Sequence, residues 1–294
     1  DKSQIFQLIQ AIKRGDKVVA AVAPAFVSQF GDQVTSSQVR EAMRRVGFDK
    51  VIEVAVGADM CTAEEAEDFL KKVPAEQPFM ATSCCPSWSM MAKKLFPEQA
   101  KCISMALTPM VLTARLIKQK EPDCKIVFVG PCAAKKLEAS RKSIRSYVDF
   151  VLTFEEVAGM FEAKGVDWKD IPEGEPLFCA SSDGRGFAVS GGVAEAVVHA
   201  VKRIDPDREV NVMSAEGLQN CKKMLQMAKI GKYDGYLLEG MACPGGCVAG
   251  AGTIQTVKKA AAALEKMKKE ASFTESYDSE YKTRLESLEK FDVE

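Results

Sequence analysis

The sequence predicts an α/β protein with small, mainly parallel sheets flanked by helices. Short apolar runs rich in Val, Ile and Phe recur along the 294 residues, and helical patterns lie between them. The apolar runs do not alternate strictly with polar residues, which is typical of strands buried on both faces. The chain is long enough for one large domain or two smaller ones with a substantial buried core.

Seven segments are predicted strands: 17–24, 50–58, 78–84, 125–132, 148–154, 208–215 and 233–240. Between the first two, residues 35–48 start with Thr and Ser and reach a Gly near their end, the usual signals for the start and stop of a helix. Residues 62–72 are also expected to form a helix, in which Thr62 and Glu65 would make a capping box.

The charge balance argues against nucleic acid or an anionic membrane surface as the main partner, because 40 basic and 41 acidic side chains give a net charge of −1. No apolar run reaches about 18 residues, so no membrane span is expected. The first residues lack the basic-then-apolar layout of a signal peptide. The absence of an initiator Met is typical of a processed chain or of part of a longer one.

Ten cysteines are many for a chain without a secretory signal. In a reducing compartment, clustered cysteines are more typical of metal ligands or redox groups than of disulfides, and a cytoplasmic location is expected. The single histidine, His199, lies in an apolar stretch and is interpreted as a packed or half-exposed helical residue. A serine-histidine triad and a zinc site built from several imidazoles are therefore not supported.

Three segments place cysteines at the ends of predicted strands: TSCCPSW at 82–88, GPCAAKKLE at 130–138 and MACPGGC at 241–247. In open parallel sheets, ligands gather beyond the carboxyl ends of the strands, so a cofactor site is expected there. Iron-sulfur clusters are usually held by four Cys thiolates, with backbone N–H groups directed at the sulfides. The Gly-Gly pair of the third segment lets the backbone approach closely and adopt positive φ.

These three segments, in this order, resemble the active-site loops of the iron-only (FeFe) hydrogenases, and the resemblance extends over about residues 15 to 255. The resemblance implies that Cys85, Cys132, Cys243 and Cys247 bind a 4Fe-4S cluster. It further implies that Cys247 bridges this cluster to a two-iron subcluster with CO, cyanide and azadithiolate ligands.

The same resemblance implies a proton path. Cys84 matches the thiol that passes protons to the two-iron subcluster, and Glu65, Asp68 and Ser104 match the groups that continue the path. Glu65 and Asp68 are three residues apart and would share a helix face, although the family has Glu where Asp68 stands. The competing interpretations are a buried small hydrophobic residue for Cys84, a helix cap for Glu65 and a solvated helix face for Asp68.

Polar and small residues also match the family's active site. The resemblance implies that Lys135 pairs with a cyanide ligand, a suitable use of an ammonium group beside an anion, and Glu138 completes the second motif. The short turn that would line the cyanides is Ala23, Pro24 and Ala25.

Phe187 and Met241 match apolar wall residues, for which ordinary core packing is the competing interpretation. The chain departs from the family pattern at Gly130, at Met110 and in the AGAGT stretch at 249–253. These departures suggest a divergent branch and remove no expected ligand.

The resemblance implies a hydrogenase that catalyses 2H⁺ + 2e⁻ ⇌ H₂, with electrons from ferredoxin or an upstream iron-sulfur domain. In the family, separate maturation proteins install the two-iron centre. The alternatives are a hydrogen- or redox-sensing relative and a cluster-assembly scaffold without the two-iron centre. Scaffold relatives typically lose the Cys at the position of Cys84 and one Gly of Pro-Gly-Gly, and both are present here. A plain electron carrier is disfavoured because the chain has no CxxCxxC run.

A single domain over residues 1–294 is expected, with two lobes and the iron-sulfur site between them. Lobe A is predicted to take about residues 1–118 plus 226–255, and lobe B about residues 119–225. This division places the first and third cysteine segments in one lobe and the second in the other. Residues 256–294 are expected to form a C-terminal helix followed by a charged tail, either a surface helix or a loose arm.

Overall fold

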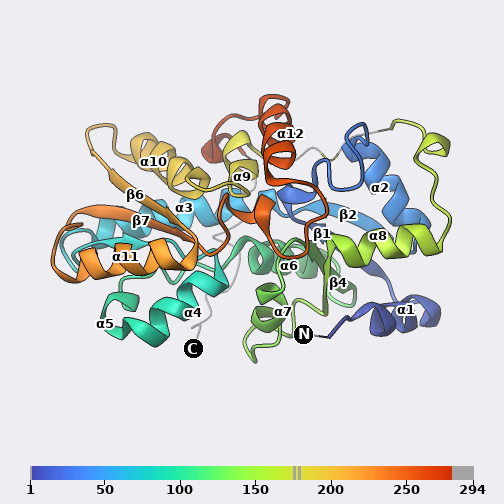
Figure 1. The fold of residues 1–294 in the computed structure, drawn as a ribbon, viewed down its shortest axis with the longest axis horizontal. Coiled ribbons are helices and arrows are strands. Elements are labelled where there is room, and N and C mark those ends of the chain that lie inside the picture. The colour runs from blue at the N-terminus through green and yellow to red at the C-terminus, as the bar shows by residue number, and fades with distance from the viewer. Residues whose placement is uncertain (1, 175–176, 178–179, 280–294) are drawn as a thin grey trace.

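The computed structural model describes residues 2–174, 177 and 180–279, and it has the α/β architecture that the sequence predicts (Figure 1). The strands are β1 (Val18–Val22), β2 (Lys50–Glu53), β3 (Met80–Ala81), β4 (Lys125–Gly130), β5 (Phe150–Thr153), β6 (Asn211–Glu216) and β7 (Tyr236–Met241). Each of the seven predicted strand segments thus overlaps one strand, and β6 and β7 each extend one residue beyond the predicted segment.

Helices flank these strands on both sides. They are α1 (Ile5–Arg14), α2 (Ser36–Arg45), α3 (Ala55–Lys72), α4 (Pro86–Leu95), α5 (Pro97–Ala100), α6 (Pro109–Lys120), α7 (Ala134–Ala139), α8 (Phe154–Ala163), α9 (Ser182–Gly186), α10 (Gly192–Ile204), α11 (Leu218–Lys229) and α12 (Val257–Lys269). Short 3₁₀ turns are η1 (Pro24–Phe26), η2 (Trp168–Asp170), η3 (Cys247–Ala249) and η4 (Ser276–Asp278).

The strands form two separate parallel sheets. The first has the order β2-β1-β4-β5, in which Val19 faces Lys50 on one side and Ile126 on the other. The second has the order β3-β7-β6, in which Met80 faces Leu237. Strands β1, β4 and β5 of the first sheet are buried almost throughout, which explains their unbroken apolar runs, whereas the edge strand β2 is only partly buried.

The strand pairing contradicts the predicted lobe boundaries. β4 and β5, which were expected in lobe B, pair with β1 of lobe A in the first sheet, and β6 pairs with β7 in the second. The chain crosses between the sheets after β2, after β3 and after β5, so neither sheet is continuous in sequence. Strand patterns do not reveal such crossovers. β3 and β7, which precede the first and third cysteine segments, do share one sheet, whereas β4, which precedes the second, lies in the other.

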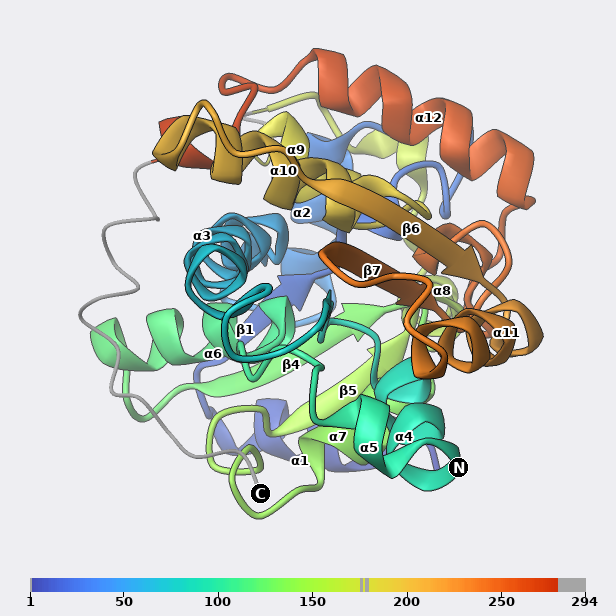
Figure 2. The ribbon, with the colours of Figure 1, turned by 90° about the vertical axis from the view of Figure 1, so that its left-hand side faces the viewer.

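The helix expected at residues 62–72 begins seven residues earlier, as α3, so Thr62 does not cap it. Its hydroxyl instead donates to the Ala58 carbonyl oxygen at 2.9 Å. The segment expected to be one strand, 50–58, is a short strand followed by the first turn of this helix. A Cβ on Gly57 would lie 2.4 Å from the Pro109 carbonyl oxygen, so small residues here let α3 pack closely against α6. Figure 2 shows α3 between the two sheets.

The other two predicted helices are present. α2 starts at the predicted N-cap, where Thr35 and Gln38 form a capping box. α12 occupies most of the segment predicted at 256–271. Of the predicted charged tail, residues 280–294 lie outside the described residues.

A buried ion pair lies at the carboxyl end of β2, an edge strand of the first sheet. Arg185 is 1% exposed and its Nε donates to Glu53 Oε1 at 2.9 Å, while its Nη1 donates to the Met267 carbonyl oxygen at 2.9 Å. The pair therefore connects β2, α9 and α12. Removing one partner of such a pair leaves a buried uncompensated charge, which typically costs about 3–5 kcal/mol.

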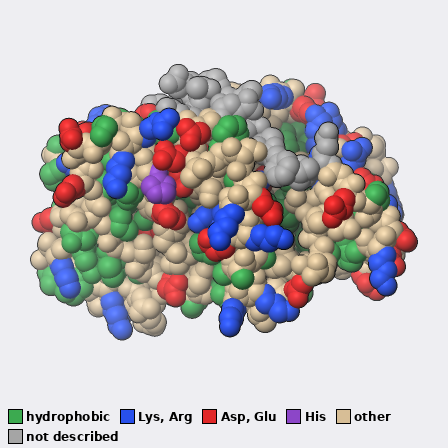
Figure 3. Space-filling view, turned by 90° about the horizontal axis from the view of Figure 1, so that it is seen from above, with side chains coloured by type: hydrophobic (Ala, Val, Ile, Leu, Met, Phe, Trp, Pro, Cys, Tyr) green, Lys and Arg blue, Asp and Glu red, His purple; other side chains and the backbone are tan. Residues whose placement is uncertain are grey.

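The surface carries both signs of charge. On the face in Figure 3, Lys and Arg side chains are interspersed with Asp and Glu, and the single histidine of the chain lies among them. The His199 side chain is 37% exposed, and its Nδ1 lies 3.0 Å from Asp183 Oδ1, as expected for a half-exposed helical residue. Within the described residues, no helix combines the length and apolar character that crossing a bilayer requires.

Candidate functional site

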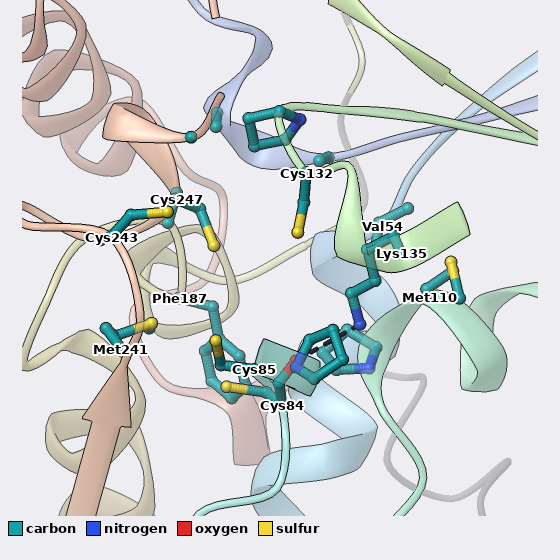
Figure 4. A pocket seen from close by; sticks show the side chains of 18 of the residues that line it. Val54, Cys84, Cys85, Met110, Cys132, Lys135, Phe187, Met241, Cys243 and Cys247 are labelled. Carbon is teal, nitrogen blue, oxygen red and sulfur yellow. Dashed lines mark hydrogen bonds between the residues drawn. The ribbon is translucent and has the colours of Figure 1, made fainter. Parts of the chain in front are cut away.

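A mostly apolar cavity lies between the two sheets, beyond the carboxyl ends of β3, β4 and β7. It encloses about 790 Å³ of empty space, its open mouth included. Five thiols line it, together with a lysine and apolar wall residues: Cys84, Cys85, Cys132, Cys243, Cys247, Lys135, Ala23, Pro24, Ala25, Phe187 and Met241. Figure 4 shows the sulfur atoms of Cys85, Cys132, Cys243 and Cys247 directed toward one common space.

The first cysteine loop follows β3 and is anchored to β7 by an indole ring. Trp88 is fully buried, and its Nε1 donates to the Thr82 carbonyl oxygen at 3.1 Å. A Cβ on Gly240 would lie 2.2 Å from the Trp88 ring, so the ring packs directly on the backbone of β7. This contact holds the first loop beside the strand that leads into the third loop.

The second loop follows β4, and two glycines that come after the third loop in the sequence pack against it. Gly252 N donates to the Pro131 carbonyl oxygen at 2.9 Å. A Cβ on Gly250 would lie 2.5 Å from that same oxygen. Only glycine allows this approach, which brings Cys132 near Cys243 and Cys247.

The Pro-Gly-Gly turn of the third loop also needs its glycines. Gly245 and Gly246 have φ of 95° and 88°, in the left-handed region that glycine favours. A Cβ on Gly246 would lie 2.6 Å from Ser190 N, which leaves no room for a side chain. Gly245 N donates to Glu216 Oε2 at 2.9 Å, and this bond fixes the orientation of the turn.

The donor set fits an iron-sulfur cluster. Burial raises the pKa of the Cys132, Cys243 and Cys247 thiols, and a negative charge on Cys85 raises each of them further. Four thiolates in this cavity therefore need a strongly cationic partner. Among the described residues, no three His, Cys, Asp or Glu side chains converge tightly enough for a single metal ion. Four Cys sulfurs around a wider space are the arrangement that a cluster of several irons requires.

Behind Cys84, Glu65 lies fully buried on α3. Glu65 Oε1 accepts hydrogen bonds from Ser83 N at 2.9 Å and from Ser83 Oγ at 3.0 Å, while Oε2 has no hydrogen-bond partner in the described structure. Burial raises the pKa of Glu65 to about 7, although the hydrogen bonds from Ser83 oppose this shift. Burial, followed by the charge of Glu65, raises the pKa of Cys84. A carboxyl group that changes protonation near neutral pH can exchange protons with a neighbouring thiol.

Ser83 is the polar residue of this cluster that the sequence analysis missed. It stands inside the TSCCPSW segment next to Cys84, so its position was visible, but its contact with Glu65 depends on how α3 packs beside β3. Two hydrogen bonds from one residue to a single carboxylate oxygen mark it as the residue that orients Glu65.

Asp68 and Ser104 lie near this cluster without a direct link. Asp68 Oδ2 pairs with Lys72 Nζ at 2.7 Å, and Ser104 Oγ accepts from Ala106 N at 3.1 Å. Within the part of the chain that the structure describes, no hydrogen bond joins either side chain to Glu65. Their part in a proton path stays a prediction.

On the opposite wall, Lys135 is held by Glu138 and the first loop. Lys135 Nζ lies 2.6 Å from Glu138 Oε2 and donates to the Cys84 carbonyl oxygen at 3.3 Å, the dashed line in Figure 4. Glu138 Oε1 also accepts from Thr108 Oγ1 at 2.7 Å. Burial, the largest single effect, lowers the pKa of Lys135, but the charge of Glu138, its hydrogen bond with Lys135 and the negative charges of Cys132 and Cys84 together outweigh burial, so the net shift is upward. The cavity therefore contains one stable ammonium group.

Three comparisons identify what the chain resembles. Residues 16–251 match the family model described as "Iron only hydrogenase large subunit, C-terminal domain". Iron hydrogenase 1 of Clostridium pasteurianum is 29% identical over 303 residues, which cover 86% of this chain and 53% of that protein. A probable cytosolic Fe-S cluster assembly factor of Aedes aegypti is 26% identical and covers 81% of this chain and 62% of its own length.

Among solved structures, the FeFe-hydrogenase HydA(deltaEFG), from work on stepwise assembly of the H-cluster, has a TM-score of 0.80. It is 25% identical and covers 98% of this chain and 94% of that one. The chain spans about half the length of the Clostridium relative.

Proposed function

The chain belongs to the iron-only hydrogenase large-subunit family, and we propose that it catalyses the reversible reduction of protons to H₂ in this cavity. The main support for this proposal is the fifth thiol in the cavity, that of Cys84. Four thiols suffice for a 4Fe-4S cluster, yet Cys84 also lines the cavity and is backed by the buried, hydrogen-bonded Glu65. Cluster binding alone has no use for this pair, whereas proton reduction needs a proton donor beside the metal.

The four remaining thiols, Cys85, Cys132, Cys243 and Cys247, would hold the 4Fe-4S cluster, with Cys247 shared with a two-iron subcluster that carries CO, cyanide and azadithiolate. When bound, this iron assembly would supply the electrons and the open metal position at which protons and H₂ interconvert. Lys135 would place its ammonium group beside the anionic ligands, because Glu138 and the Cys84 carbonyl oxygen hold it against the cavity. Ala23, Pro24, Ala25, Phe187 and Met241 would exclude water from the same space.

The chain itself would move the protons. Cys84 would hold a proton at the cavity wall as a neutral thiol, because burial and the nearby Glu65 disfavour its thiolate. Glu65 would accept or return that proton, since the pKa of its carboxyl group is about 7. Ser83 would keep the carboxyl group oriented through its two hydrogen bonds. Asp68 and Ser104 would continue the path toward solvent.

Electrons would come from a ferredoxin or from an iron-sulfur domain attached upstream, and maturation proteins would install the two-iron subcluster. A cytoplasmic location would suit the free thiols, because none of the cysteines that the structure describes forms a disulfide.

A cluster-assembly role is the second candidate, because the Aedes aegypti relative carries such a name at similar identity. That role would need the four-cysteine cluster but no two-iron subcluster and no proton relay. A hydrogen- or redox-sensing role would keep both clusters and turn over slowly.

Cys84→Ala in protein matured under anaerobic conditions separates these functions, with Cys102→Ala as the matched control. Cys102 is also a buried free cysteine, but it lies in the core of the second sheet, away from the cavity. We expect Cys84→Ala to keep the iron content and the infrared bands of CO and cyanide while it loses most H₂ production, and Cys102→Ala to keep all three. An assembly scaffold would show no CO or cyanide bands and no H₂ production in any of these proteins.

A further inference from the structure

A second pocket lies on the other side of the relay, between α4 and α7, which lie side by side in Figures 1 and 2. We call it the α4–α7 pocket and define it by Ser83, Lys93, Ser104, Thr108, Glu138 and Arg141, all of which line it. It encloses about 540 Å³ of empty space, including its opening to solvent. None of the metal-site cysteines lines it.

One hydroxyl group separates the buried Glu65 from this pocket. Ser83 Oγ lies 3.0 Å from Glu65 Oε1 and equally 3.0 Å from the Ala106 carbonyl oxygen. A hydroxyl group has a single proton, so it can serve only one of these acceptors fully at a time. Because Ser83 also lines the pocket, its oxygen can accept a proton from one side and release its own to the other.

The mouth of the pocket is positively charged. Lys93 extends from α4 and Arg141 follows the end of α7, and within the described residues neither forms an ion pair. Thr108 and Val111, at the start of α6, line the same space, so the positive end of that helix dipole adds to the field.

The acidic group of the pocket does not cancel this charge. Glu138 is the only carboxylate among the described lining residues. Lys135 neutralises its charge, because Lys135 Nζ lies 2.6 Å from Glu138 Oε2. Glu138 Oε1 is further occupied by the Thr108 hydroxyl group at 2.7 Å. Ser104 Oγ accepts from Ala106 N, and in the described part of the chain no acceptor takes its proton, so this hydroxyl group is free to donate into the pocket.

Two cationic side chains, a helix N-terminus and hydroxyl donors around a small concave space are the features that bind a tetrahedral oxyanion. We propose that the α4–α7 pocket binds a small protonatable oxyanion of the phosphate type, and that this anion exchanges protons with Glu65 through the Ser83 hydroxyl group. The binding site stands on the pocket's own residues, whereas its part in hydrogen turnover rests on the proposed function.

The proton balance is simple. For proton uptake, dihydrogen phosphate gives one proton to Ser83 Oγ, and Ser83 passes its own proton to the Glu65 carboxylate. Hydrogen phosphate remains in the pocket and leaves or is reprotonated by solvent. The reverse sequence releases a proton. The second ionisation of phosphate lies near neutrality, so the anion both accepts and donates under ordinary conditions. Sulfate has the same shape and binds by the same contacts, but it carries no proton at neutral pH.

The first arm of the test measures binding to the iron-loaded protein by titration calorimetry with inorganic phosphate. We expect saturable binding that weakens at least tenfold in the double variant Lys93→Ala, Arg141→Ala. The matched control is Lys94→Ala, Lys142→Ala, which removes two exposed cations next in sequence that do not line the pocket. Absence of saturable binding in the parent, or equal binding in both double variants, overturns the site.

The second arm measures how fast the Glu65 carboxyl group exchanges its proton for deuterium after rapid mixing with D₂O. The infrared band is assigned by its loss in Glu65→Gln. We expect phosphate to accelerate exchange in the parent and sulfate to bind without accelerating it. Ser83→Ala should lose the acceleration and Ser83→Thr should regain it. Iron content is measured for every variant.

Exchange that does not respond to phosphate, or that responds equally in Ser83→Ala, contradicts the role of the pocket. Neither arm uses hydrogen production as its readout. A parent that binds phosphate and exchanges as expected but makes no H₂ would therefore refute the proposed function and leave the pocket's assignment standing.

Discussion

Replacing Glu65 with glutamine should flatten the pH dependence of the protein's stability. Glu65 is fully buried, and its pKa moves from 4.5 to about 7 in the folded protein. Between these values the folded state holds one proton more than the unfolded state, so the free energy of unfolding falls as pH rises. At about 1.4 kcal/mol per pKa unit, the loss is about 3 kcal/mol, complete once the pH has passed the folded pKa.

Glutamine keeps the oxygen that accepts from Ser83 but cannot ionise. Its amide N–H groups would stand at the position of Oε2, which has no hydrogen-bond partner among the described residues, and this adds a cost that does not depend on pH. The free energy of unfolding of the variant is therefore compared with that of the parent at each pH. The free energy of unfolding of Glu65→Gln minus that of the parent should rise by about 3 kcal/mol between pH 4.5 and pH 8.

The assay is urea unfolding at matched iron content, followed by circular dichroism at a series of pH values. Glu67→Gln is the control, because Glu67 lies on the same helix but is exposed, and its profile should run parallel to that of the parent. If the difference in the free energy of unfolding between Glu65→Gln and the parent stays constant from pH 4.5 to pH 8, Glu65 does not have the raised pKa on which the prediction depends, whatever the activity of the variant.

Three further predictions follow from the cavity. Cys84→Ala should retain iron and lose most H₂ turnover, and Asp68→Asn should cause a milder loss of the same kind. Hydrogen production is measured by gas chromatography, and production at the parent rate in Cys84→Ala would exclude proton transfer through the Cys84 thiol. Cys132→Ala should lose the 4Fe-4S cluster and much stability, because cluster binding contributes to folding, and full iron content by colorimetric assay would remove Cys132 from the ligand set. Gly246→Ala should cost about 1–3 kcal/mol of stability from backbone strain and should lower iron loading, because its Cβ would lie 2.6 Å from Ser190 N. The control, Gly159→Ala on α8, should be tolerated because its Cβ would meet nothing within 4 Å, and equal thermal stability of the two variants would argue against the tight turn.

The sequence sufficed for the strands and for the convergence of the cysteines. Cys85, Cys132 and Cys243 were placed together because parallel strands carry their following residues to one edge, and all three line one cavity. Lys135 and Met241 line it as well. These predictions needed only local patterns, namely apolar runs and motifs at strand ends.

Features that depend on how distant segments pack were not predictable in this way. The lobe boundaries were wrong because β4 pairs with β1 across more than a hundred residues. The capping role of Thr62 was wrong because the preceding small residues pack into the core as helix rather than strand. The contact between Ser83 and Glu65 depends on the placement of α3, and the α4–α7 pocket depends on three separate segments, 83–93, 100–111 and 138–144. None of these has a periodic signature along the chain.

The interconversion of protons and H₂ in this cavity can be measured as the formation of HD from D₂ in ordinary water. The measurement is made by mass spectrometry on protein loaded with iron and matured under anaerobic conditions, and it requires neither an electron donor nor a partner protein. We expect steady HD production by the parent and a large loss in Cys84→Ala at unchanged iron content. A fully loaded parent that shows the CO and cyanide bands yet forms no HD would contradict the proposed function.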